Sequence, residues 1–194
     1  MDSFYDLLMR GDLDASTQVE TNNVLPPKAL GNFKRGDMVT IKGDQFIVLG
    51  GECGGIALLG TFSIGYGVFG ETTEYKYSMP FSKTRIFYDA IASKIGEDKI
   101  ICIPVDLTAL DGTNVVGTRP LPASIPTLDI YRKNRDIIAR GELPCGNIWL
   151  ATRYSANVDE TMVISDNGNV DILMCSDEGH VIPYIVFTKD VLVD

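Results

Sequence analysis

The sequence predicts an α+β protein with short, twisted antiparallel sheets and two helices, preceded by an extended N-terminal arm. Short apolar runs separated by turn residues fill positions 148–187, which is typical of strands. An apolar stripe at helical spacing lies at 80–95, which indicates a helix. Because the first residues are polar and contain prolines, we divide the chain into an arm, 1–36, and a domain, 37–194.

The overall composition limits the partners of the chain. Its 194 residues carry a formal net charge of −9, and this field repels phosphates and acidic lipids, so we expect no nucleic-acid and no membrane partner. No apolar run reaches the roughly 18 residues of a membrane span. The start of the chain lacks the basic and apolar regions of a signal peptide, so we expect synthesis in a bacterial cytoplasm without secretion.

The arm begins with apolar side chains at the spacing of a short helix. They are Phe4, Tyr5, Leu7 and Leu8. A polar stretch at 14–23 and two prolines follow, where neither a helix nor an inner strand is expected. Two interpretations stay open. The segment is either a frayed terminus or a docking arm whose apolar side chains insert into a partner subunit, because exposing them costs about 25 cal/mol per Å².

The domain opens with strands. Alternating residues at 38–42 and 45–49, around a Gly43-Asp44 turn, predict a β-hairpin. The glycine-rich stretch 50–55 is predicted as a loop. It lacks the Lys-Ser/Thr of a phosphate-binding loop, and the run that follows, 56–64, is strand-like. Nucleotide binding is therefore not expected.

An aromatic, loop-like segment comes next. Tyr66, Tyr75 and Tyr77 offer large ring surfaces with a polar tip and few torsions to immobilise. Two alternatives stay open for these rings. They recognise a ligand together with Arg153 and Tyr154, or they fold back over the core.

Two helices and the final strands complete the prediction. Helix 80–95 has an apolar stripe formed by Ile86, Phe87, Ala90, Ile91 and Ile95, with Gly96 as its C-terminal residue. Residues 99–104 are predicted as a strand, and a shorter helix is predicted from Pro126. Asn167-Gly168 predicts a two-residue hairpin turn. We expect the C-terminal sheet to form around Trp149 and residues 190–194 to pair with a sheet edge.

The sequence contains no catalytic constellation. His180 is the only histidine and has a structural context, and the segment 166–171 lacks the glutamate at position twelve of a calcium loop. The cysteines lie far apart and are predicted to be small buried hydrophobes; they are Cys53, Cys102, Cys145 and Cys175. The Arg-Gly-Asp tripeptides at 10–12 and 35–37 are interpreted as turns. We therefore expect no catalytic residue, no metal, no cofactor and no enzymatic activity.

Several segments share their order with a known family. They are 36–41, 45–49, 56–59, 85–95, 121–124, 147–153, 166–170 and 179–185. In this order the chain resembles an uncharacterised bacterial and phage domain of the C-type-lectin-like superfamily, related in fold to formylglycine-generating enzymes. The family usually has Trp-Leu-Arg-Ser, where this chain has Ala151-Thr152 after Trp149-Leu150, and an arginine where this chain has Ile182. The resemblance implies a mixed fold with irregular binding loops.

Three functions follow from these observations. The first is a non-enzymatic virion or surface-display protein, such as a capsid decoration, head fibre or tail component, which docks through its arm onto other virion subunits and is compatible with a homo-oligomer. The second is a receptor module that binds a host surface glycan or protein through its aromatic loop. The third is a divergent enzyme of the formylglycine-generating type, although the chain offers no positions for that family's copper-binding cysteine pair.

Overall fold

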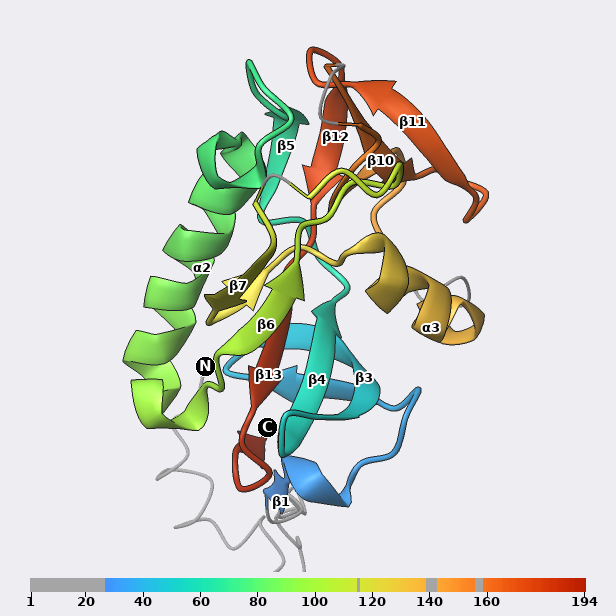
Figure 1. The fold of residues 1–194 in the computed structure, drawn as a ribbon. Coiled ribbons are helices and arrows are strands. Elements are labelled where there is room, and N and C mark those ends of the chain that lie inside the picture. The colour runs from blue at the N-terminus through green and yellow to red at the C-terminus, as the bar shows by residue number, and fades with distance from the viewer. Residues whose placement is uncertain (1–26, 115, 139–142, 156–158) are drawn as a thin grey trace, which may run out of the picture.

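The computed structural model describes residues 27–114, 116–138, 143–155 and 159–194. Over these residues the α+β prediction is confirmed, because two α-helices pack beside small, mostly antiparallel sheets (Figure 1). The helical elements are α2 (Met79–Ile95), α3 (Leu128–Ile138) and the 3-10 turns η1 (Leu30–Asn32), η2 (Tyr75–Tyr77) and η3 (Glu97–Lys99). The strands are β1 (Lys28–Ala29), β2 (Met38–Ile41), β3 (Asp44–Glu52), β4 (Gly55–Gly60), β5 (Gly65–Val68), β6 (Ile103–Asp106), β7 (Thr118–Leu121), β8 (Ala123–Ser124), β9 (Ile148–Arg153), β10 (Glu160–Ile164), β11 (Val170–Met174), β12 (Glu178–Val181), β13 (Tyr184–Phe187) and β14 (Leu192–Val193).

Two five-stranded sheets in the described part of the chain form the body. One has the order β2-β3-β4-β13-β8 and the other has the order β11-β10-β9-β12-β5. The chain passes from β12 in one sheet to β13 in the other through Ile182 and Pro183. Helix α2 runs alongside both sheets, because it contacts β5 of one and β8 of the other (Figure 1). Strands β6 and β7 form a separate pair.

Trp149 lies at the centre of the larger core. It is fully buried on β9, and its Nε1 donates a hydrogen bond of 3.0 Å to the backbone oxygen of Gly67. The neighbouring strand β12 has Gly179 against the indole, where a Cβ would lie 2.9 Å from Trp149 Cε2. The prediction that the C-terminal strands form a sheet around Trp149 is confirmed.

A second core joins α2 to the other sheet. Phe46 and Phe187 pack edge to face with ring centroids 6.3 Å apart, and Phe87 of α2 lies 6.4 Å from Phe46. The predicted helix is confirmed, with Ser78 as its N-cap and Gly96 as its C-cap. Its predicted stripe is partly wrong, because Ile86 is 64% exposed. The shorter helix, α3, is confirmed as well.

The first hairpin is confirmed, but the glycine-rich stretch after it is not a loop. Residues 50–52 continue β3, and Cys53-Gly54 make a two-residue turn into β4. Cys53 and Gly54 have φ of +48° and +85°, the conformation that a type I′ turn requires at both positions. Cys53, Cys102 and Cys145 are exposed, so the prediction of buried thiols holds only for Cys175.

The Asn167-Gly168 hairpin exists with a longer turn than predicted. Ser165 N–H bonds the Asn169 carbonyl at 2.9 Å, and Gly168 N–H bonds the Ser165 carbonyl at 2.8 Å, so three residues form the loop. Gly168 has a φ of +74°, whereas Asn167 is not left-handed. Asn167 acts instead through its side chain, whose Oδ1 accepts the backbone N–H of Asn169 at 2.9 Å. A type I turn followed by a left-handed glycine is the usual three-residue solution.

The last part of the predicted arm belongs to the folded body. Strand β1 pairs with β14 through Lys28↔Val193 and Ala29↔Leu192. Leu30 is fully buried, and the predicted boundary at residue 36 therefore lies too late in the chain. The pair β1-β14 forms a separate two-stranded sheet, and the backbone N–H of Asp194 bonds the Thr40 carbonyl of the edge strand β2 at 2.8 Å, in agreement with the expected edge contact of the C-terminal residues. Strand β6 begins at Ile103, four residues after the predicted start at Lys99.

Candidate functional site

A surface cavity lies between the aromatic segment and β7. Its volume is about 370 Å³, within the range of small-molecule pockets. We call it the tyrosine cavity, lined by Glu74, Tyr75, Lys76, Tyr77, Phe81, Leu107, Val116, Arg119, Pro120 and Leu121. It brings together two of the predicted ligand-binding residues, Tyr75 and Tyr77.

The 3-10 turn η2 holds these tyrosines against the start of α2. Ser78 Oγ donates to the carbonyl oxygen of Tyr75 at 2.7 Å and accepts the backbone N–H of Phe81 at 3.2 Å. This single hydroxyl caps α2 and fixes the end of η2, as a serine N-cap can. The backbone N–H of Met79 bonds the Phe69 carbonyl at 2.8 Å. These bonds join the C-terminal end of the turn to α2 and to the buried residue Phe69.

Tyr75 forms the buried floor of the tyrosine cavity. It is 3% exposed, and its ring packs edge to face with Phe81 at a centroid distance of 5.4 Å. Its hydroxyl lies 3.2 Å from Thr84 Oγ1 and accepts the backbone N–H of Ile125 at 3.0 Å. Burial raises the pKa of Tyr75 to about 12. Of the two alternatives left open by the sequence, Tyr75 follows the second: its ring folds over the core, and its polar tip is used inside the protein.

Tyr77 forms part of the cavity rim. It is 69% exposed, and the Lys76 ammonium lies 5.3 Å from the centroid of its ring. An aromatic ring attracts a cation over its face, so the two side chains support each other at the surface. Tyr77 is therefore a predicted contact residue that is exposed to solvent and also lines the cavity.

Another part of the lining comes from β7, a strand that the sequence analysis did not predict. Its ladder with β6 pairs Val105 with Arg119 and Pro104 with Pro120. A two-stranded pair tolerates prolines because edge strands can do without a ladder N–H. Arg119 is exposed and makes no ion pair with any residue in the described ranges. The cavity lining therefore contains two cations, Lys76 and Arg119, and one carboxylate, Glu74, in a chain of net charge −9.

The other predicted ligand residues lie elsewhere. Tyr66 is exposed on β5, with its ring 4.7 Å from that of His180. Tyr154 is 37% exposed just after β9. Arg153 is 4% exposed, and its Nε and Nη2 have no hydrogen-bond partner among the described residues. Neither Arg153 nor Tyr154 lines the tyrosine cavity, so the structure does not gather the five predicted residues into one site.

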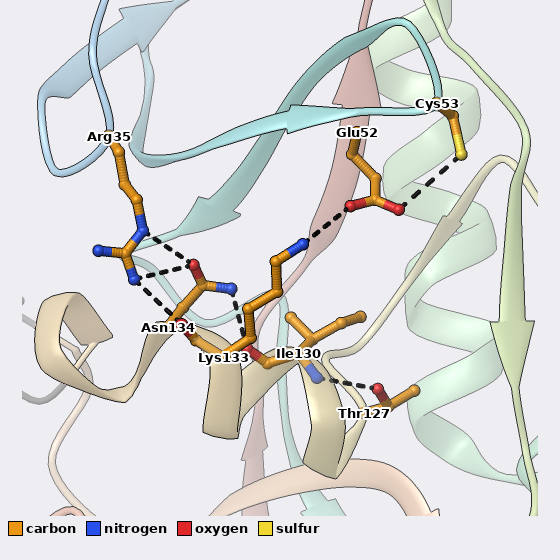
Figure 2. Close-up of polar contacts among 7 residues, drawn as sticks. All are labelled: Arg35, Glu52, Cys53, Thr127, Ile130, Lys133 and Asn134. Atoms are coloured by element: carbon orange, nitrogen blue, oxygen red, sulfur yellow. Dashed lines mark hydrogen bonds and ion pairs between the residues drawn. The ribbon is translucent and has the colours of Figure 1, made fainter.

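Arg35 of the second Arg-Gly-Asp tripeptide is tied to α3, although its side chain is 40% exposed. Its Nη1 and Nη2 bond the two carboxylate oxygens of Asp136 at 2.9 and 2.7 Å. Figure 2 shows the same guanidinium against Asn134, whose Oδ1 accepts at 3.3 Å. The Asp37 carboxylate accepts the backbone N–H of Lys34 at 2.7 Å. These bonds support the interpretation as a turn.

Other observations limit the chemistry of the described residues. Within them, no three His, Cys, Asp or Glu side chains are grouped so as to hold a metal ion. Nor does any helix in the described ranges have the length and apolar character needed to cross a membrane. The predicted docking residues Phe4, Tyr5, Leu7 and Leu8 lie outside the described residues, so their role stays a prediction.

The fold and this cavity define a class, an α+β domain with an aromatic, cation-bearing surface cavity. Comparisons of the chain with protein-family models, with curated proteins and with solved structures find no match. Function is therefore argued from the cavity itself.

Proposed function

We propose that the protein is a non-catalytic binding module that holds a carbohydrate ligand in the tyrosine cavity. The observation that carries the proposal is that Tyr77 and Arg119, 42 positions apart in the chain, line the same cavity of about 370 Å³. The apolar C–H face of a sugar packs against an aromatic ring, while its hydroxyls need charged or polar partners. Arg119 offers a planar set of donors for those hydroxyls, and Glu74 offers acceptors.

The rigidity of the cavity supports the same proposal. Tyr75 and Ser78 tie η2 to α2 and to Ile125 through buried hydrogen bonds. A preformed wall lowers the entropy that a weak ligand must offset on binding. Tyrosine itself immobilises only two torsions when it makes contact. These features favour a recognition role over a packing role for the exposed ring of Tyr77.

A glycan array with four variants tests this proposal. We expect Tyr77→Ala and Arg119→Ala each to weaken glycan binding by about tenfold or more, which corresponds to about 1.4 kcal/mol. The matched controls are Tyr66→Ala and Arg85→Ala, which remove an exposed tyrosine and an exposed arginine outside the cavity. Equal losses in the controls, or no glycan bound by the parent protein, contradict the proposal.

Two broader expectations also remain proposals. One is that the chain is a divergent member of the C-type-lectin-like superfamily, which is supported by the mixed α+β architecture with two helices in the described part. The other is that the protein is displayed on a virion or another surface, where a glycan-binding body serves attachment. Removal of residues 1–26 tests the second expectation. If these residues dock the protein onto a partner, the truncated protein should still fold but should no longer assemble. Assembly of the truncated protein would contradict a docking arm.

A further inference from the structure

Arg119 lies on the inward face of the two-stranded ladder between β6 and β7. The ladder pairs Arg119 with Val105 and Leu121 with Ile103, and directly paired residues have their side chains on the same face. Val105 and Ile103 are buried in the larger core, whereas the alternate pair, two prolines, is exposed on the outer face. The arginine side chain therefore starts from a face that is otherwise apolar, and it joins the lining of the tyrosine cavity.

Arg119 has no counterion within the described ranges. It forms no ion pair and no hydrogen bond with any residue of those ranges. Arg35, by contrast, has the Asp136 carboxylate at 2.7 Å although its side chain is also exposed. A guanidinium offers five donors and no acceptor, and its planar fork fits two oxygens of a carboxylate or of a tetrahedral oxyanion. The side chain of Arg119 is therefore available to bind such a group.

The second cation of the lining is Lys76. Its ammonium lies 5.3 Å from the centroid of the Tyr77 ring, and it has no carboxylate within ion-pair distance in the described part of the chain. Glu74 is the single carboxylate among the lining residues. The lining is therefore net positive, although the whole chain carries −9. A cavity concentrates such a local field and attracts ligands of the opposite charge.

Most of the remaining lining is apolar. Tyr75 and Leu107 are buried, and Phe81, Val116 and Leu121 are half-buried. A free inorganic anion would leave this apolar surface uncovered. The ligand that uses the whole cavity therefore combines a carbon ring with an oxyanion.

We propose that the sugar held in the tyrosine cavity is an anionic one, whose carboxylate or sulfate group binds Arg119 with support from Lys76. The inference rests on the proposed function, because it names the class of sugar for the same cavity. Hydrogen bonds between charged partners are stronger than those between neutral partners. An oxyanion at Arg119 therefore adds more to the affinity than a hydroxyl at the same position, while Tyr77 contacts the C–H face of the ring.

Four sugars that share one ring test the inference by NMR titration of the ¹⁵N-labelled full chain. They are glucose, glucuronic acid, glucose 6-sulfate and glucosamine in its protonated form, titrated at one pH and one ionic strength because salt screens exposed charges. We expect saturable shifts in residues 74–77 and Arg119, with at least one anionic sugar binding about tenfold more tightly than glucose. Tighter binding of glucuronic acid identifies a carboxylate ligand, and tighter binding of glucose 6-sulfate identifies a sulfate; both results support the inference.

Variants of the full chain are compared by one ratio, the affinity for the tighter anionic sugar divided by that for glucose. Arg119→Gln should bring this ratio close to one, and Lys76→Gln should lower it by about threefold. Glu74→Gln should raise it, because the one negative charge of the lining is removed. Arg132→Gln makes the same change of charge on α3, outside the cavity, and should leave the ratio unchanged.

The results that overturn the inference differ from those that overturn the sugar site. If glucose binds as tightly as both anionic sugars, or if glucosamine binds most tightly, the inference fails while the proposed function stands. A preference that survives Arg119→Gln, or that Arg132→Gln lowers equally, arises from charges elsewhere and also overturns it. The absence of saturation with all four sugars overturns the inference and, together with an empty glycan array, the proposed function.

Discussion

The hydroxyl of Tyr75 accepts a hydrogen bond from the backbone N–H of Ile125 at 3.0 Å, although the two residues are 50 positions apart. Thr84 Oγ1 donates to the Phe81 carbonyl at 2.9 Å, so the Tyr75 hydroxyl is the donor in its contact with Thr84. One phenol therefore connects η2, α2 and the segment after β8. The floor of the tyrosine cavity depends on this connection.

The Tyr75→Phe variant tests that connection. The change leaves the Ile125 N–H buried without its acceptor, and an unsatisfied buried group costs about 1–3 kcal/mol. We expect the free energy of unfolding to fall by that amount in urea denaturation. Tyr77→Phe is the matched control, because Tyr77 is 69% exposed and should change stability by less than about 0.5 kcal/mol. Equal effects in the two variants contradict a structural role for the Tyr75 hydroxyl.

Stability should fall at alkaline pH. An unfolded tyrosine ionises near pH 10, whereas burial raises the pKa of folded Tyr75 to about 12. Between these values the unfolded state has lost the proton and the folded state has kept it. The free energy of unfolding therefore decreases with rising pH, by about 1.4 kcal/mol per unit for this residue.

Urea denaturation between pH 9 and 12 measures the effect, with Tyr75→Phe as the comparison. The variant should show a shallower decrease than the parent protein. Tyr184 contributes a slope of the same sign, because burial raises its pKa as well. Parallel slopes in the two proteins are incompatible with a Tyr75 that resists ionisation in the fold.

A glycine substitution tests the packing around the tryptophan. A Cβ at Gly179 would lie 2.9 Å from Trp149 Cε2 and Nε1 and 3.1 Å from the Asn147 carbonyl, so Gly179→Ala overpacks a rigid core and should cost about 1–3 kcal/mol. Gly51→Ala is the control, because its nearest contact would be the Gly55 carbonyl at 3.9 Å. Thermal unfolding of both variants measures the loss of stability, which should be larger for Gly179→Ala than for Gly51→Ala. If Gly51→Ala destabilises as strongly as Gly179→Ala, the clash with the indole is not the cause.

The set of hydrogen bonds that joins Arg35 to α3 is also testable. Arg35 joins Asp136, Asn134 and the Lys133 carbonyl. We expect Arg35→Ala to speed amide hydrogen exchange in residues 133–138 and to leave β9 and β10 unchanged. Arg132→Ala, which removes only the 3.8 Å contact with Asp129, should have a smaller effect. Unchanged exchange in α3 would show that this guanidinium does not hold the helix.

Patterns within short stretches of sequence predicted helix α2 and the first β-hairpin. The helix α2 has its cap residues Ser78 and Gly96 in the sequence, and the first hairpin has alternating residues around a glycine. Short-range patterns do not report pairings between distant segments, which explains why β7 was missed. Its Pro120 gives no strand signal in the sequence, and the strand is defined by its ladder with β6.

The candidate site was only partly predictable for the same reason. Composition singled out Tyr75 and Tyr77 as contact residues, but only the tertiary structure shows that one is buried and the other exposed. Arg119 carried no signal, because its role depends on β7 and η2 lining the same cavity. Arg153, predicted to contact a ligand beside these tyrosines, is buried. Residue type suggests chemistry, and the long-range fold decides which residues meet.

The most direct test of the central claim is NMR mapping of monosaccharide binding on the ¹⁵N-labelled protein. Galactose, N-acetylglucosamine and glucuronic acid serve as probes, each titrated separately. The account predicts that at least one of them shifts amide signals of residues 74–77 together with Arg119 and Leu121, and that Tyr77→Ala abolishes these shifts. Shifts confined to the surface around Tyr66 and Tyr154, or none with any probe, would contradict a sugar site in the tyrosine cavity.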